Sequence, residues 1–326
     1  INSVLMTNPE ALDLAARLDR ERRETGSRGP LHGIPILLKD NIDTGDRMMT
    51  SAGSLALASP ADADAVLAAR LRAAGCVLLG KTNLSEWANF RSTRSASGWS
   101  GVGGQTRNPH VLNRNPCGSS SGSGAAVAAG LCAGAIGTET DGSIVCPSNA
   151  NGIVGIKPTL GLVSRSGIVP IAHSQDTAGP MARTVADAAA ILSALVGPDP
   201  ADTITTGSNV ESHPDYTRFC TRGDLGGIRL GVARNYTGFH EGADLLLAQA
   251  LRALGELGAT VVDPADIPNK GDYDDAEYEV LLYEFKAGLN KYLAGRSRLD
   301  VRTLEDLIEF NLSHAEAEMP FFQQEI

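Results

Sequence analysis

Two clusters of small and hydroxyl-bearing residues mark the places where this chain could carry out chemistry. The first, G-S-S-S-G-S-G, spans residues 118–124, and the second, G-T-E-T-D-G-S-I-V-C-P, spans residues 137–147. In the second cluster Ser143 follows Gly142, and a glycine allows neighbouring backbone N–H groups to turn toward one point. Converging amides beside a hydroxyl suit an oxyanion site, where a serine attacks a carbonyl carbon.

A serine needs a base before it can act as a nucleophile. None of the six histidines stands in a nucleophile-elbow or comparable context; they are His32, His110, His173, His213, His240 and His314. Lys39 is the other choice, because it ends the apolar run at 34–38, where burial would disfavour its charged form. Base chemistry at neutral pH requires its pKa to fall by roughly three units from the ordinary ~10.4. The alternative is a surface lysine at a strand end, paired with Asp40.

The cluster at 118–124 could instead bind phosphate or act as a linker. A Gly-rich loop before a helix can hold phosphate on backbone N–H groups. This loop lacks a G-K-[ST] ending and dinucleotide-binding spacing, and no β-rich run precedes it. A flexible Gly/Ser linker fits poorly, because residues 125–131 are expected to form a helix directly afterwards, capped by a serine.

The elements expected to position these clusters alternate between helices and strands. Helical spacing of apolar residues predicts helices at 11–23, 61–74, 126–131, 185–196 and 243–257. Short apolar runs bounded by turn residues predict strands at 33–39, 76–80, 154–156, 228–232 and 260–262. Such alternation predicts the α/β class, with a mainly parallel sheet covered by helices on both faces.

Two polar stretches interrupt this alternation. Residues 90–116 are rich in Gly, Ser, Asn and Arg, and loops of this length inside a compact domain are usually functional or disordered. Because this stretch leads into the serine cluster, we favour function. Residues 203–222 are polar and contain Pro214, which predicts a surface excursion between two halves.

Composition limits the partners. Of 326 residues, 28 are Lys or Arg and 38 are Asp or Glu, a net charge of −10 that argues against nucleic-acid binding. Apolar residues make up 42%, which is enough for a core, but no run approaches the ~20 residues of a membrane-spanning helix. An odd number of cysteines without a C-x-x-C pair predicts buried free thiols rather than disulfides or zinc ligands; they are Cys76, Cys117, Cys132, Cys146 and Cys220.

Four ordered blocks strongly resemble the amidase signature family. They are L-H-G-I-P-I-L-L-K-D-N-I (31–42), G-K-T-N-L-S-E-W-A-N-F (80–90), C-G-S-S-S-G-S (117–123) and G-T-E-T-D-G-S-I (137–144). Further matches at 154–159 and 174–188 extend the pattern to about 31–197. The resemblance implies a mixed, mainly parallel twisted sheet and a single amidase domain over 1–326. Because the chain starts at Ile1 and family members are typically longer, we expect a fragment lacking N- and C-terminal parts.

The same resemblance implies a Ser-cisSer-Lys triad. Lys39 closes the G-I-P-x-x-x-K block, Ser119 is the serine joined to its neighbour by a cis peptide bond, and Ser143 is the nucleophile. The family's separation of the two serines is kept, since 143 − 119 = 24. Asn89 and Ser120 are expected at the substrate pocket. Neither a metal nor an organic cofactor is implied.

This chain departs from the usual family block G-T-D-T-G-G-S-I-R at Glu139, Asp141 and Val145. The carboxylate of Asp141 could repel negative charge developing in the oxyanion site, or bind a cationic group of the substrate. The implied oxyanion donors survive these changes because they are backbone N–H groups; they belong to Thr140, Asp141, Gly142 and Ser143.

The blocks at 85–90 and 138–147 are most similar to those of bacterial peptide amidases. This implies an enzyme that hydrolyses the C-terminal amide of peptides to the free acid and ammonia. The alternatives are a glutamine-hydrolysing amidotransferase subunit, a general small-amide or aryl-amide amidase, and a non-catalytic binding module. The expected partner is a small-molecule or peptide amide, not nucleic acid or membrane, and the expected location is the cytoplasm unless a signal peptide preceded Ile1.

Overall fold

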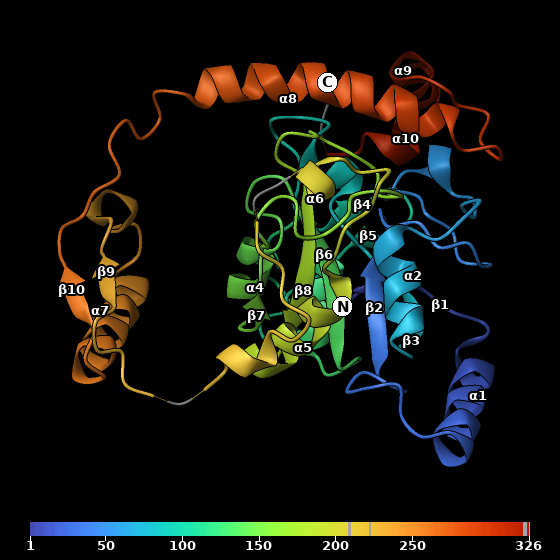
Figure 1. The fold of residues 1–326 in the computed structure, drawn as a ribbon. Helices are drawn as coiled ribbons and strands as arrows, with labels where there is room; N and C mark the ends of the chain where they lie inside the picture. The colour runs from blue at the N-terminus through green and yellow to red at the C-terminus, as the bar shows by residue number, and fades with distance from the viewer. Residues whose placement is uncertain (208–209, 222, 322–324, 326) are drawn as a thin grey trace. The chain divides into compact units, whose positions relative to one another are not determined.

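The computed structural model describes residues 1–207, 210–221, 223–321 and 325. They form two compact units, of which the first comprises Ile1–Arg218 with Leu281–Ile326 and the second comprises Phe219–Val280 (Figure 1). Helix α8, Asp274–Ala294, runs through the boundary between these ranges. Because the chain divides into these two units, the single domain expected over 1–326 stays a proposal. All the candidate site residues lie in the first unit.

A six-stranded sheet with the order β1-β3-β2-β6-β8-β7 forms the centre of the first unit. Its strands are β1 Val4–Thr7, β2 Pro35–Lys39, β3 Val77–Thr82, β6 Gly134–Glu139, β7 Val154–Gly155 and β8 Thr177–Ala182. Strand β2 is parallel to β3 and β6, whereas β1 and β8 run antiparallel to their neighbours. Since β7 is antiparallel to β8, it shares the direction of β6. The mixed, mainly parallel sheet expected from the sequence is confirmed.

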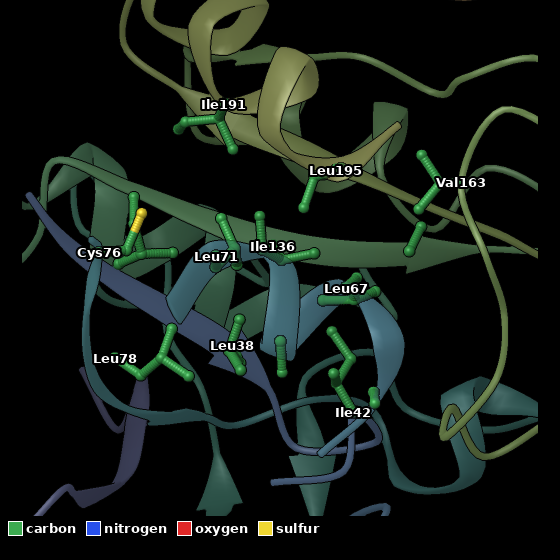
Figure 2. Packing of buried hydrophobic residues seen from close by; sticks show 14 of the residues in the cluster. Leu38, Ile42, Leu67, Leu71, Cys76, Leu78, Ile136, Val163, Ile191 and Leu195 are labelled. Atoms are coloured by element: carbon green, nitrogen blue, oxygen red, sulfur yellow. The ribbon is translucent and has the colours of Figure 1, made fainter. Parts of the chain in front are cut away.

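Helices cover both faces of this sheet. Strand β2 alternates between them: Ile36 and Leu38 pack with α2 (Val66–Ala73) and α5 (Val185–Leu195), and Leu37 packs with α3. Helix α3 comprises Ser121–Ala128, and α1, which packs on β3, comprises Ala11–Glu24. Figure 2 shows the first of these clusters, with Leu38, Leu67, Leu71, Ile136, Ile191 and Leu195 converging. Burial on both faces explains why β2 is a continuous apolar run.

Helix α3 begins inside the serine cluster, five residues earlier than its apolar pattern predicts. Gly122 explains this start, because a Cβ there would lie 2.3 Å from the carbonyl oxygen of Ser3 and 2.4 Å from that of Asn83. Close packing therefore requires glycine at position 122, which overrides the poor helix propensity of that residue.

The second unit contains a βαβ arrangement. Strands β9 (Arg229–Gly231) and β10 (Thr260–Val262) pair in parallel, and helix α7 (Glu241–Glu256) connects them, as the sequence predicted. Other elements are short or peripheral: β4 Trp99–Ser100, β5 Gly104–Gln105, α4 Val145–Ala150, α6 Ile204–Gly207, α9 Leu304–Ser313, α10 Ala315–Glu318 and the 3₁₀ turns Leu55–Leu57, Glu86–Asn89, Thr217–Phe219 and Arg234–Tyr236. None of the described helices has both the length and the apolar character needed to cross a bilayer.

Candidate active site

Lys39 lies at the carboxyl end of β2 with its side chain fully buried. Its Nζ lies 2.8 Å from Oγ of Ser119 and 2.8 Å from Oγ1 of Thr138. Burial lowers the pKa of Lys39 to about 7, against the opposing effect of the Asp176 and Glu139 carboxylates. A surface lysine is therefore excluded. Above about pH 7 the uncharged form of the amine predominates.

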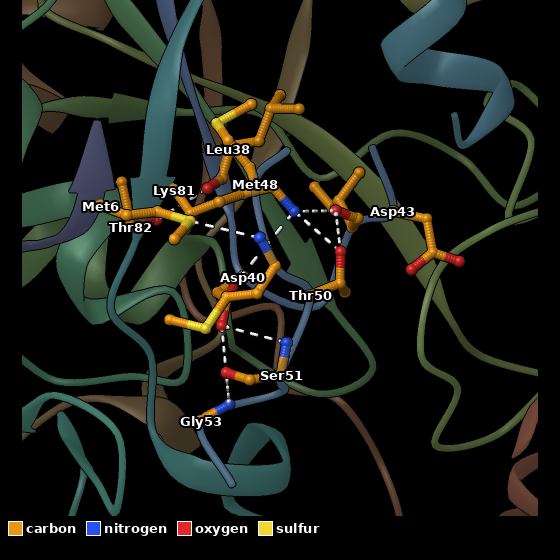
Figure 3. A network of polar contacts seen from close by, with 12 residues as sticks. Met6, Leu38, Asp40, Asp43, Met48, Thr50, Ser51, Gly53, Lys81 and Thr82 are labelled. Carbon is orange, nitrogen blue, oxygen red and sulfur yellow. Dashed lines mark hydrogen bonds and ion pairs between the residues drawn. The ribbon is translucent and has the colours of Figure 1, made fainter. Parts of the chain in front are cut away.

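The carboxylate next to Lys39 in the sequence has a different partner. Asp40 lies 3.9 Å from Nζ of Lys81 and accepts hydrogen bonds from the N–H and hydroxyl of Ser51 (Figure 3). Lys81 also donates to Oγ1 of Thr50 at 2.9 Å. Burial raises the pKa of Asp40 to about 6, although Lys81 lowers it. The sequence left open a surface Lys39 paired with Asp40; the structure overturns that alternative, because the partner of Asp40 is Lys81 on β3.

Ser119 is fully buried at the start of the turn that leads into α3. The peptide bond between Gly118 and Ser119 is cis. The carbonyl of Ser119 accepts a hydrogen bond from the N–H of Ser85 at 3.0 Å. Gly118 is required here, since a Cβ would lie 2.2 Å from Oγ of Ser85. The fold therefore fixes the backbone of Ser119 and directs its hydroxyl toward Lys39.

Ser143 lies in the turn between β6 and α4 and is 7% exposed. Its carbonyl accepts a hydrogen bond from the N–H of Ser120 at 3.1 Å, so the two serine loops are in direct contact. Gly142 adopts a φ of 76°, the left-handed conformation that glycine accommodates best. In the described part of the chain, the hydroxyl of Ser119 accepts a hydrogen bond from Lys39 but makes none with the hydroxyl of Ser143. A proton relay between the two serines is therefore a proposal.

Two carboxylates hold the loop that carries the predicted oxyanion donors. Glu139 accepts hydrogen bonds from the N–H groups of Ile144 at 2.6 Å and Val145 at 3.0 Å, immediately after Ser143. Asp176 accepts a hydrogen bond of 2.5 Å from the hydroxyl of Thr140, and burial raises its pKa. Both carboxylates lie within the family blocks, but neither was predicted to have this role.

A cavity of about 430 Å³ opens beside Thr138, Glu139 and Thr140. Its wall carries charges of both signs, contributed by Asp43, Asp176, Asp202, Arg165, Lys291 and Arg296. Thr138, Glu139 and Thr140 place the cavity beside the two serine loops, although Lys39, Ser119 and Ser143 are not among its described lining residues; it is the candidate substrate site.

The structure gives Asn89 and Ser120 local hydrogen bonds. The amide of Asn89 accepts from Ser95 at 2.8 Å and donates to Ser97 at 3.3 Å. The Ser120 hydroxyl donates to the carbonyl of Thr138 at 3.1 Å. Their substrate-binding roles stay predictions. Asp141 is solvent-exposed, which weakens any repulsion it exerts on a developing oxyanion.

The expectation of five free thiols is wrong for two of them. Cys117 and Cys146 form a disulfide with their Cα atoms 5.9 Å apart. Cys76 and Cys132 are free and buried, as predicted, and Cys220 is free but exposed. The fold brings Cys117 and Cys146 together although they are 29 residues apart, and no sequence motif marks them as a pair. Over the described ranges, no three His, Cys, Asp or Glu side chains are grouped like metal ligands.

The hydroxyl of Thr138 is expected to hold the amine of Lys39 in place, because it accepts hydrogen bonds from Lys39 and from Asn41. Thr138→Val should lower kcat about 10-fold and the free energy of unfolding by ~1–3 kcal/mol, since it leaves buried donors unpaired. Thr44→Val is the control: this buried hydroxyl has no partner in the described structure, so its loss should be nearly neutral. Enzyme kinetics and urea unfolding of both variants test this, and an unchanged kcat in Thr138→Val would contradict it.

The fold and this geometry define an α/β protein with a buried lysine–serine pair at the carboxyl end of an interior strand, β2. A family profile described as Amidase matches residues 1–319. The chain belongs to the amidase signature family, which confirms the family expected from its motifs.

The chain is similar to a probable amidase, to peptide amidases and to an amidotransferase subunit. The chain is 46% identical over 326 residues to a probable amidase from Arabidopsis thaliana, covering 98% of this chain and 62% of that protein. Two peptide amidase structures, the native enzyme from Stenotrophomonas maltophilia and a complex with the competitive inhibitor chymostatin, are each 54% identical, with TM-scores of 0.93 and 0.94. Each alignment covers 99% of this chain and 66% of the peptide amidase chain.

A glutamyl-tRNA(Gln) amidotransferase subunit from Symbiobacterium thermophilum is 39% identical over 284 residues, covering 86% of this chain and 56% of that protein. The chain thus spans less than two thirds of the length of the curated relatives it matches.

Proposed function

We propose that the protein hydrolyses amides through Lys39, Ser119 and Ser143, and that its substrates are peptides with a C-terminal amide. The observation that carries this proposal is the fully buried amine of Lys39, with a pKa of about 7, placed 2.8 Å from the Ser119 hydroxyl. A buried amine that is neutral at working pH can act as a general base.

The reaction begins when neutral Lys39 accepts the proton of Ser119, which in turn takes the proton of Ser143. Oγ of Ser143 then attacks the amide carbon, and the negative charge on the oxygen is stabilised by backbone N–H groups of residues 140–143. The same relay returns a proton to the nitrogen, and ammonia leaves. In the second half of the reaction, the relay takes a proton from water, and the water oxygen attacks the acyl-enzyme carbonyl. A proton returns to Oγ of Ser143, and the free acid leaves.

Similarity to peptide amidase supports the substrate class, because the two chains are 54% identical over 99% of this chain and 66% of the peptide amidase chain. The experiment is an ammonia-release screen of the full-length protein over peptide amides, aliphatic amides, aryl amides and glutamine. We expect the highest kcat/KM for a peptide amide. A higher value for glutamine, or for a small aliphatic amide, would contradict the peptide assignment but not amide hydrolysis.

A glutamine-hydrolysing amidotransferase subunit is the second candidate, because of the similarity to the glutamyl-tRNA(Gln) amidotransferase protein. It predicts co-purification with a tRNA-binding partner protein, together with glutamine hydrolysis that rises on complex formation. A non-catalytic binding module predicts that Ser143 resists a serine-reactive phosphonate.

The disulfide bears on where the protein works. Disulfides persist mainly in oxidising compartments and are rare in the cytosol. The Cys117–Cys146 bond therefore argues against the cytoplasmic location expected from the sequence and favours an oxidising compartment.

A further inference from the structure

We propose that the Cys117–Cys146 disulfide positions the two reacting serines relative to each other, and that reduction by a dithiol reversibly lowers the rate of amide hydrolysis. This inference rests on the proposed function of Ser119 and Ser143. It assigns to the two cysteines a positioning role, since neither contacts the reacting atoms.

The location of the bond is the first argument. Cys117 stands two residues before Ser119, and Cys146 stands three residues after Ser143 in the first turn of α4. The bond therefore joins the loop of one serine to the helix that follows the other. A cross-link this close to both residues restricts the relative movement of their backbones more than a distant one would.

The second argument is the kind of contact that otherwise joins these segments. The N–H of Ser120 donates to the carbonyl of Ser143 at 3.1 Å, and the amide of Asn151 bridges the carbonyls of Pro116 and Pro147 at 2.9 and 2.7 Å. These contacts are single hydrogen bonds of buried groups, each of which contributes only modestly to holding the segments together. The disulfide adds a covalent cross-link between the two segments.

The third argument is the backbone of Cys117, which has a φ of 60°. A non-glycine residue holds this left-handed conformation only where its surroundings constrain it. Cys117 is constrained by hydrogen bonds with Asn115 and Ser121 and by the disulfide. Releasing the bond removes one constraint at the residue that precedes Gly118 and Ser119.

The bond is also within reach of a reductant. Cys146 is exposed and Cys117 is half-buried, in contrast with the buried Cys76 and Cys132. A thiolate of the dithiol attacks one sulfur to give a mixed disulfide, and its second thiol then displaces the other protein sulfur. The protein gains two thiols and the dithiol becomes a cyclic disulfide, so two electrons are transferred. Oxidised glutathione reverses the reaction.

The experiment follows thiol content and turnover together. In denatured full-length protein, the cysteines of residues 1–326 should provide three reactive thiols before treatment with dithiothreitol (those of Cys76, Cys132 and Cys220) and five after it. Below the unfolding temperature, kcat for a peptide amide should fall at least ~10-fold on reduction, with little change in KM, and should recover with oxidised glutathione. Circular dichroism verifies that the reduced protein is still folded.

Two variants act as controls. Cys220→Ser removes the exposed free thiol and should respond to reduction like the wild type. Cys117→Ser combined with Cys146→Ser should have a low kcat from the start and no response to dithiothreitol; if it does not fold, chemical reduction of the wild type still decides.

The outcomes separate this inference from the proposed function. Folded, reduced protein that retains the kcat of the oxidised protein would overturn the positioning role while leaving amide hydrolysis intact. Five thiols before reduction would overturn it as well. Oxidised protein that hydrolyses no amide at all would overturn the proposed function, and the inference with it.

Discussion

Ser143→Ala is expected to lower kcat/KM for a peptide amide at least ~10³-fold, because it removes the atom that forms the acyl-enzyme. The free energy of unfolding should change by less than ~1 kcal/mol, since the hydroxyl is bonded to neither Lys39 nor Ser119 in the described structure. Ammonia release and thermal unfolding measure the two effects.

The matched control is Ser148→Ala on α4, the helix that follows Ser143. The Ser148 hydroxyl is buried and donates to the carbonyl of Ile144 at 2.7 Å, so its loss should affect stability by ~1 kcal/mol and activity only slightly. Ser143→Ala with more than a tenth of the wild-type rate would remove Ser143 from the role of nucleophile.

Lys39→Met should cause a loss of similar size and should also change the pH profile. Because burial lowers the pKa of Lys39 to about 7, the protonated fraction of the amine grows as the pH falls through that value. A protonated amine cannot accept the proton of Ser119, so wild-type kcat/KM should fall about tenfold per pH unit below that point. The variant should lose this limb together with most of its rate.

Lys286→Met is the control for this experiment, since Lys286 is exposed on α8 and the described structure gives it no hydrogen bond to Ser119. Its pH profile should match the wild type. A limb near pH 7 that persists in Lys39→Met would assign the base to another group.

Sequence reasoning succeeded where local patterns determine structure. The apolar run before Lys39 predicted the strand, and together with the family resemblance it favoured a buried lysine over a surface one. The structure shows both the strand and the burial. Helix α5 and strand β10 lie where their apolar spacing placed them. Both elements were predicted from the local spacing of apolar residues alone.

The features that were missed depend on contacts between distant segments. The disulfide joins residues 29 apart, and the partner of Asp40 lies on another strand. Glu139 was noted only as a departure from the family pattern, yet it accepts the N–H groups of Ile144 and Val145. Strand β8 has small residues and no strong β propensity, so its pairing with β6 became visible only in the fold.

Peptide mapping by mass spectrometry after labelling with a fluorophosphonate tests the catalytic assignment most directly. We expect one adduct, on Ser143, that forms more slowly as the pH falls below about 7 and that is nearly absent in Lys39→Met. An adduct on a different serine, or a labelling rate that is the same with and without Lys39, would contradict it.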